Sequence, residues 1–247
     1  MQIYEKTRLA EEKMARLFGS RRDFSENLRK WEDPALPDKH DHNCFEYKSQ
    51  PTPEEFAAAL DYQRQTGANF IKLEGDFPLD RDFGLEMGLT LTMAAPADKS
   101  LWRLNRELTF NRPGLAELEE LEVKHYGPVY GEDFCRRNIR RLYEKLDYHG
   151  AYLGGKLAGA CYSFTAGDLP GAAGVTCLDG LLVDEDLRNR YIATSLLAWV
   201  MDLIRPELLF LHADAEDTPQ DMYRKMGFST VDRLYEYSCA DLSKLGR

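Results

Sequence analysis

The sequence predicts a soluble protein of the α/β (α+β) class that folds in two parts. Its 247 residues are enough for one large domain or two modest ones. Strand-like and helical segments alternate along the chain, and the segment PADKS, near residues 96–100, connects a small α+β layer to a longer one. We therefore expect an N-terminal α+β lobe over 1–100 and a second unit over 101–247.

The composition argues against several classes of protein. Apolar residues make up 43% of the chain and charged residues 30%, and no apolar run approaches the roughly 18 residues that span a bilayer. The first residues lack the apolar stretch of an export signal. The formal net charge of -10 argues against nucleic-acid binding and mildly favours a cationic or amine substrate. We expect a cytoplasmic protein that binds neither membranes nor nucleic acids.

The cysteines favour reduced thiols. They are 5 in number, scattered and never spaced as CxxC, which fits neither a disulfide framework nor a thiolate zinc site. His40, His42 and Cys44 alternate, as soft metal ligands on one face of a strand would. That segment has the character of a loop, however, and a fourth ligand is not evident. We expect no metal.

In the N-terminal part, apolar periodicity and turn residues predict one small α+β layer. Residues 19–43 are rich in charge and proline and have no sustained apolar period, so we expect a covering loop there. The segment PTPEEF opens a helix with proline in its first turn. The expected elements are helices over 3–18 and 53–66 and strands over 44–49, 69–75 and 88–95.

In the second part, the same signals predict the order β, α, α, β, β, β, α, β, α, β. The turn Gly154, Gly155 and Lys156 joins two strands into a hairpin. The expected helices cover 114–124, 131–146, 192–204 and 218–226, and the expected strands cover 106–110, 150–155, 157–166, 175–183, 207–215 and 228–242.

The turn after the strand 175–183 is a candidate anion site. The first turn of a helix offers main-chain N–H groups without partners, and the helix dipole adds about 0.3 to 1 kcal/mol for a nearby anion. Arg188 and Arg190 add positive charge beside it. The alternative is the solvated first turn of an ordinary surface helix.

A second motif, MYRKMGF, follows downstream. Tyr223 lies on a short predicted helix and can direct its hydroxyl back along the sheet, while Gly227 ends that helix and Phe228 enters the core. Taken with the preceding strand, turn and helix, this order resembles the GCN5-related N-acetyltransferase (GNAT) superfamily. The resemblance covers roughly 102–240.

The long motif of that family is matched in part. Val183 ends the strand, Arg188 takes the arginine position and Ala193 the last position, but Tyr191 stands where the family has glycine. In the second motif, Glu216 replaces a common asparagine. Any residue except proline supplies the main-chain donor, so pyrophosphate binding stays the hypothesis. Tyr191 in ordinary helical geometry would turn its ring away from the phosphates or cover them.

The resemblance implies a mixed, mostly antiparallel central sheet flanked by helices. It also implies direct acetyl transfer from acetyl-CoA to an amine acceptor, without a metal. The implied pantetheine-aligning residues are Leu181, Leu182 and Val183, and the implied pyrophosphate-binding residues are Arg188, Asn189, Arg190, Tyr191, Ile192, Ala193 and Thr194.

The resemblance also implies catalytic roles. Tyr223 would protonate the departing thiolate. Asp179 would deprotonate the amine, and the alternative for it is a buried hydrogen-bond network; His212 is the second candidate base. Tyr126 and Tyr130, in the loop between two predicted helices, are candidate substrate contacts or, alternatively, aromatic packing.

Two questions stay open in the sequence. Residues 1–100 resemble a degenerate acetyltransferase-like lobe, because SQPTPEEFAAALDYQ and FNRPGLAELEELEVK both place proline before an amphipathic helix. The competing function is a noncatalytic CoA-binding sensor or partner-binding module, which the Tyr191 and Glu216 departures favour. Serine-hydrolase and phosphate-loop motifs are absent. The chain is expected to be a monomer or homodimer.

Overall fold

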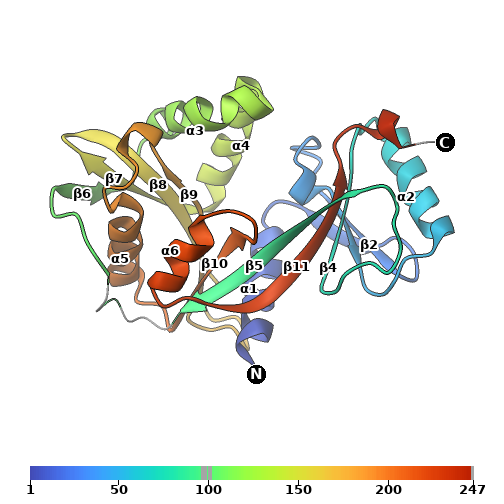
Figure 1. Cartoon of the computed structure of the whole chain (residues 1–247), viewed down its shortest axis with the longest axis horizontal. Coiled ribbons are helices and arrows are strands. Elements are labelled where there is room, and N and C mark those ends of the chain that lie inside the picture. The colour runs from blue at the N-terminus through green and yellow to red at the C-terminus, as the bar shows by residue number, and fades with distance from the viewer. Residues whose placement is uncertain (96–98, 100–101, 246–247) are drawn as a thin grey trace. The chain divides into compact units, whose positions relative to one another are not determined.

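The computed structural model describes residues 1–95, 99 and 102–245. The chain forms two compact units, each built around neighbouring hydrogen-bonded strands (Figure 1). The predicted connector near 96–100 lies largely outside the described residues, and the division at residue 100 stays a prediction. The first unit consists of 1–11, 93–212 and 221–229, and the second of 12–92, 213–220 and the residues from 230 onward.

The strands of the first unit lie in the order β10-β9-β8-β7-β6. Strands β6 to β9 are antiparallel to their neighbours, whereas β9 and β10 are parallel. Helix α5 (Ile192–Ile204) makes the crossover that a parallel pair needs. This mixed, mostly antiparallel arrangement confirms the predicted fold class. The strands are β6 (Leu108–Asn111), β7 (Asp147–Leu153), β8 (Lys156–Thr165), β9 (Val175–Val183) and β10 (Leu208–Asp214).

The elements of this part follow the predicted order, which is confirmed throughout: β6-α3-α4-β7-β8-β9-α5-β10-α6-β11, with β11 at Ser229–Cys239. Helix α5 is apolar on most of its surface and buries Leu196, Leu197 and Val200. The chain's first helix contributes its N-terminal residues to the same unit. The helices are α1 (Ile3–Ala15), α3 (Leu115–Tyr130), α4 (Glu132–Lys145) and α6 (Pro219–Lys225).

Helix α3 is longer than predicted. We expected it to end near residue 124, before Gly127 and Pro128, but it continues to Tyr130. Pro128 forgoes one main-chain hydrogen bond without ending the helix. The terminator is Gly131, whose φ of 85° is left-handed. Tyr130 therefore lies on a helix and not on a loop, and the predicted loop there is wrong.

Helices α3 and α4 are joined by ion pairs. The buried carboxylate of Glu119 accepts hydrogen bonds from Arg136 Nη1 at 2.9 Å and from Arg140 Nε at 2.5 Å. Arg137 pairs with Asp133 on its own helix. The basic run on α4 is therefore neutralised by acids of the two helices.

The second unit has the strand order β1-β2-β3-β4-β11-β5. Strands β1, β2 and β3 are successively antiparallel, and β3 and β4 are parallel and joined by helix α2 (Pro53–Gln65). The strands are β1 (Ser20–Asp23), β2 (Leu28–Glu32), β3 (Phe45–Tyr47), β4 (Ile71–Gly75), β5 (Glu86–Ala95) and β11 (Ser229–Cys239).

The predicted covering loop over 19–43 is wrong, because β1 and β2 lie within it. The many charged residues of this segment made it resemble a loop, but β2 is largely buried. Its buried residues are Leu28, Lys30 and Trp31. The Lys30 ammonium donates to the Asn43 carbonyl at 2.7 Å and lies 4.5 Å from the centroid of the Phe45 ring. Burial lowers the pKa of Lys30 to about 8.

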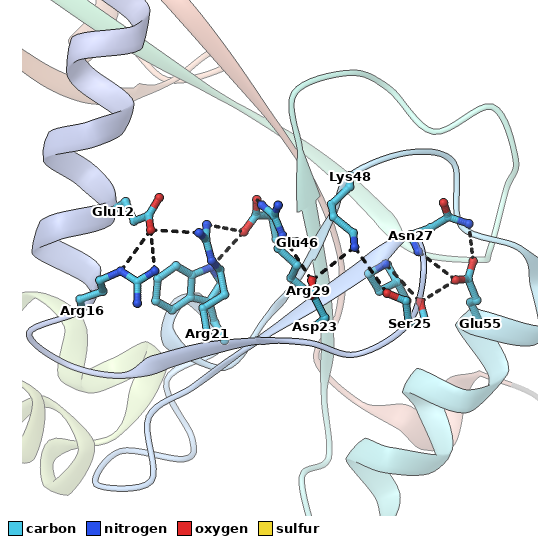
Figure 2. Close-up of polar contacts among 12 residues, drawn as sticks. Glu12, Arg16, Arg21, Asp23, Ser25, Asn27, Arg29, Glu46, Lys48 and Glu55 are labelled. Carbon is cyan, nitrogen blue, oxygen red and sulfur yellow. Dashed lines mark hydrogen bonds and ion pairs between the residues drawn. The ribbon is translucent and has the colours of Figure 1, made fainter. Parts of the chain in front are cut away.

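The second unit repeats the topology of the first. The run β1-β2-β3-α2-β4 has the same pairing directions as β7-β8-β9-α5-β10: two antiparallel steps, then a parallel step through a helix. Figure 2 shows the polar contacts along β1 to β3, from Glu12 through Arg21 to Glu46, and on to Glu55. The two units therefore share a topology over these elements, and the acetyltransferase-like character of residues 1–100 stays a prediction.

Candidate active site

The turn before α5 has the conformation that glycine favours. Asn189 and Tyr191 have φ angles of 64° and 57°, and Tyr191 is the N-cap of the helix. Ordinary helical geometry for Tyr191 was therefore a wrong prediction. The left-handed conformation costs an L-residue about 1–2 kcal/mol, and it occurs at the position where the family motif has glycine. Tyr191 thus adopts a conformation that glycine would adopt without this cost.

Side chains from outside the turn donate hydrogen bonds to two of its main-chain carbonyls. The Ser195 hydroxyl donates to the Tyr191 carbonyl at 2.6 Å, and Asn105 Nδ2 donates to the Arg190 carbonyl at 3.1 Å. The Tyr191 ring is turned outward with 48% of the residue exposed, and Arg103 Nη1 donates to its hydroxyl at 3.3 Å. These contacts stabilise a strained turn.

The start of α5 is free of acidic side chains. Its first turn, which lies wholly within the described residues, has no side-chain cap and no acidic residue. Exposed Arg188 and Arg190 lie just before it. Lys124 from α3 donates to Asp184 at 2.7 Å and to Asp186 at 2.8 Å, which fixes the preceding turn η2 (Glu185–Leu187). First-turn N–H groups and two arginines can together hold a pyrophosphate.

The corresponding helix of the second unit is closed to an outside anion. The Glu55 carboxylate folds back over the start of α2 and accepts from the Thr52 N–H at 2.9 Å, from the Asn27 N–H at 3.1 Å and from the Ser25 hydroxyl at 2.5 Å. Figure 2 shows Glu55 reaching Ser25 and Asn27. Partial burial raises the pKa of Glu55, but these donors outweigh it and lower the pKa to about 2.

Strand β9 pairs with β10 over only the first part of β9. Among the described residues, pairing between them covers only Val175–Cys177 against Leu208–Phe210. On the other side, pairing with β8 shifts register beside Tyr162. Leu181 to Val183 therefore have main-chain groups without a ladder partner on the β10 side. An extended pantetheine arm can hydrogen-bond to such an edge.

Gly180 shapes this part of β9. Its φ is 60°, and a Cβ there would lie 2.5 Å from the Tyr162 ring. The Tyr162 hydroxyl donates to Asp179 at 3.2 Å, and the Gly180 N–H donates to the same carboxylate at 2.6 Å. The glycine therefore lets the phenol and the carboxylate meet.

Asp179 is held as a carboxylate. Burial raises its pKa, but His212, the Gly180 N–H and Tyr162 together keep the pKa below its ordinary value. His212 Nδ1 lies 3.8 Å from Asp179 Oδ2. Asp179 thus belongs to a hydrogen-bonded network, and it is ionised at neutral pH.

His212 is held as an imidazolium. Its Nε2 lies 2.8 Å from Glu11 Oε1, on α1. Burial lowers the pKa of His212, but Asp179, Cys177 and Glu11 raise it well above its ordinary value. A protonated imidazole cannot accept a proton, which disfavours His212 as the base.

Tyr223 is buried on α6, with its ring 5.8 Å from that of Phe228. Burial, and then the charge of Asp179, raise its pKa above the ordinary value, so the phenol keeps its proton at neutral pH. Gly227 has a φ of 94° and follows the helix end, as predicted. Trp102 Nε1 donates to the Met226 carbonyl at 2.7 Å and anchors this segment.

Tyr126 and Tyr130 lie on the last turns of α3, with ring centroids 6.0 Å apart. Tyr130 is 61% exposed. Tyr126 is half-buried, and burial, Glu122, Tyr130 and Asp179 raise its pKa. Tyr126 is therefore within electrostatic range of Asp179, while Tyr130 lies further out on the surface.

Tyr148, on β7, places a buried phenol beside this network. Its ring centroid lies 5.5 Å from that of Tyr162. Within the described residues, it is the buried side chain whose hydroxyl has no hydrogen-bond partner. No local sequence pattern points to Tyr148 or Glu11, whereas Tyr162 could have been found by pairing the predicted hairpin with the following strand.

The three possible metal ligands His40, His42 and Cys44 each have a different partner. His42 Nδ1 binds Asp33 at 3.0 Å, the His40 ring stacks on Phe70, and Cys44 donates to the Asp41 carbonyl. These side chains have separate structural roles. Among the helices of the described residues, none has both the length and the apolar character needed to cross a membrane.

Solved structures with a similar fold extend over both units. A functionally unknown conserved protein from Staphylococcus epidermidis is 17% identical, with a TM-score of 0.74, over 90% of this chain and 94% of that one. A GCN5-related N-acetyltransferase from Kribbella flavida is 15% identical, with a TM-score of 0.64, over 100% of both chains. At these identities the likeness shows the fold.

A tandem GNAT protein from the clavulanic acid biosynthesis pathway is 14% identical, with a TM-score of 0.55, over 90% of this chain and 78% of that one. This likeness, too, shows the fold alone. No curated protein matches the chain. The acetyltransferase (GNAT) family model matches residues 115–228, the span from α3 through the Tyr223 motif to Phe228. Residues 115–228 are therefore similar to the acetyltransferase (GNAT) family, and the solved structures show the same fold over both units.

Proposed function

We propose that the chain is an N-acetyltransferase that moves the acetyl group of acetyl-CoA to an amine of a small molecule, peptide or protein. The observation that carries this proposal is the left-handed turn at Asn189 and Tyr191. It opens the first turn of α5 beside two arginines, next to the free edge of β9. A helix start with these properties binds phosphate groups.

In this proposal the turn and the strand edge hold different parts of acetyl-CoA. The free edge of β9 aligns the pantetheine arm, and Arg188 and Arg190 place positive charge beside the helix start. The pantetheine-aligning residues are Leu181, Leu182 and Val183, and the pyrophosphate-binding residues are Arg188, Asn189, Arg190, Tyr191, Ile192, Ala193 and Thr194.

Acetyl-CoA, when bound, supplies the thioester carbonyl that the amine attacks. Asp179 accepts the proton that the acceptor must lose, because it is ionised and supported by Tyr162 and the Gly180 N–H. Tyr223 donates its proton to the departing thiolate, because burial keeps the phenol protonated. Each such group is worth about 10²- to 10⁴-fold in rate.

The acceptor is proposed to be a cationic amine. Ionised Asp179 attracts an ammonium, Tyr126 offers an aromatic ring near it, and Tyr130 extends this aromatic surface outward. The formal net charge of -10 also favours a positively charged acceptor. We further propose a cytoplasmic protein, monomeric or homodimeric, that needs no metal and binds neither nucleic acid nor membrane.

The test measures CoA thiol release from acetyl-CoA with n-butylamine, 1,4-diaminobutane and 2-phenylethylamine as acceptors. Wild-type protein should transfer acetyl to at least one of them. Tyr223→Phe should lower kcat and leave acetyl-CoA affinity nearly unchanged. Tyr143→Phe is the control, since its phenol binds the Pro113 carbonyl. Unchanged turnover in Tyr223→Phe would remove Tyr223 as the acid, and CoA binding without any transfer would favour a noncatalytic sensor.

A further inference from the structure

Helix α1 contributes one side chain to the Asp179 network. Glu11 Oε1 lies 2.8 Å from His212 Nε2, across 201 residues of sequence. The other nitrogen of the same imidazole, Nδ1, lies 3.8 Å from Asp179 Oδ2. One imidazole therefore lies between two carboxylates, one from α1 and one from β9.

The charges of these three side chains do not cancel. An imidazolium between two carboxylates leaves one net negative charge, and the side chains are 24% exposed for His212, 29% for Glu11 and 36% for Asp179. Partial shielding from water strengthens their interaction. Without Glu11, His212 and Asp179 would form a neutral pair, which attracts an ammonium weakly and is a poor proton acceptor.

We propose that Glu11 is a positioning residue, which fixes His212 against Asp179 so that the trio keeps one negative charge and takes the acceptor's proton at Asp179. An N–H bond of the acceptor ammonium breaks, its electron pair stays on nitrogen, and an O–H bond forms on Asp179. The trio passes from one negative charge to none. This inference rests on the proposed acetyl transfer.

Other titratable groups lie around the trio. Cys177 of β9 is hydrogen-bonded to His212, and Tyr162 of β8 donates to Asp179. The negative charge of Asp179 also raises the pKa of four other side chains. These are Tyr126 of α3, Tyr148 of β7, Cys161 of β8 and Tyr223 of α6. Each is a phenol or thiol whose pKa is raised, so the trio is the part of this network that carries charge at neutral pH.

Two substitutions should move the pH profile in opposite directions. Glu11→Gln removes a negative charge, so the proton affinities of His212 and Asp179 fall and the acidic limb of kcat/KM moves down by about one pH unit, a tenfold change in proton affinity. His212→Gln removes the positive charge beside Asp179, so the same limb moves up. A purely structural role for Glu11 predicts no such opposite shifts.

The direct measurement is the titration of the His212 ring by NMR in the full chain, which needs no acceptor. The midpoint should fall by about one pH unit in Glu11→Gln. Glu12→Gln is the matched control: its carboxylate, on the same helix, pairs with Arg16 and Arg21, and its loss should leave the midpoint unchanged. Glu11→Asp retains the charge and should retain most of the wild-type midpoint if Glu11→Gln folds poorly.

The outcomes separate the inference from the function on which it rests. An equal His212 midpoint in wild type and Glu11→Gln overturns the inference, as does amine acetylation whose acidic limb is unmoved in Glu11→Gln. Failure of the wild type to acetylate n-butylamine, 1,4-diaminobutane and 2-phenylethylamine counts against the proposed function, while the NMR midpoints still decide whether Glu11 sets the charge of the trio.

Discussion

The conformation of Tyr191 makes a quantitative prediction about stability. Its φ of 57° is one that glycine adopts freely and that costs other L-residues about 1–2 kcal/mol. Tyr191→Gly and Tyr191→Ala both remove the exposed ring and its hydrogen bond with Arg103. Comparing these two variants with each other therefore isolates the backbone conformation.

The expected difference is small but measurable. Glycine relieves about 1–2 kcal/mol of strain, and its greater freedom in the unfolded chain offsets about 0.4–1 kcal/mol of that gain. Tyr191→Gly should thus exceed Tyr191→Ala by about 1 kcal/mol in free energy of unfolding, measured by equilibrium urea denaturation. Equal stability, or greater stability of Tyr191→Ala, would refute the left-handed assignment.

Three further predictions concern other parts of the chain. Tyr223→Phe should lower kcat for amine acetylation by about 10²- to 10⁴-fold with little change in the Kd for acetyl-CoA, as measured by steady-state kinetics and titration. Gly180→Ala should displace the Tyr162 ring and lower activity, because a Cβ would lie 2.5 Å from it; a crystal structure with Tyr162 unmoved would contradict this. Glu55 stabilises the fold above about pH 4.5, and that stability is lost as the pH falls toward about 2, so Glu55→Gln should show a flatter pH dependence of thermal unfolding below 4.5.

The order of elements and the two motifs could be predicted because their signals are local. Apolar periodicity defined the elements from β6 to β11, and Tyr223 with Gly227 and Phe228 occurs within a few residues. Strands β1 and β2 were missed because their charged residues resemble a loop. The Lys30 stem is buried while its ammonium binds the Asn43 carbonyl, which no periodicity count detects.

The network around Asp179 depends on contacts between distant segments. Asp179 was found because a family motif places a carboxylate on that strand. Glu11 was not found, since it meets His212 only in the folded chain, across 201 residues of sequence. The backbone of Tyr191 was predicted incorrectly because residue type favours the ordinary conformation, and the Ser195 and Asn105 contacts that hold the turn are not visible in sequence.

In the proposed function, the turn before α5 holds the pyrophosphate of acetyl-CoA. Calorimetric titration of the full chain with acetyl-CoA, and separately with CoA, tests it most directly. We expect micromolar binding, about -8 kcal/mol, with one molecule per chain, because Glu55 closes the corresponding helix start of the second unit. Absence of binding would contradict the site itself, and two molecules per chain would contradict the closed second unit.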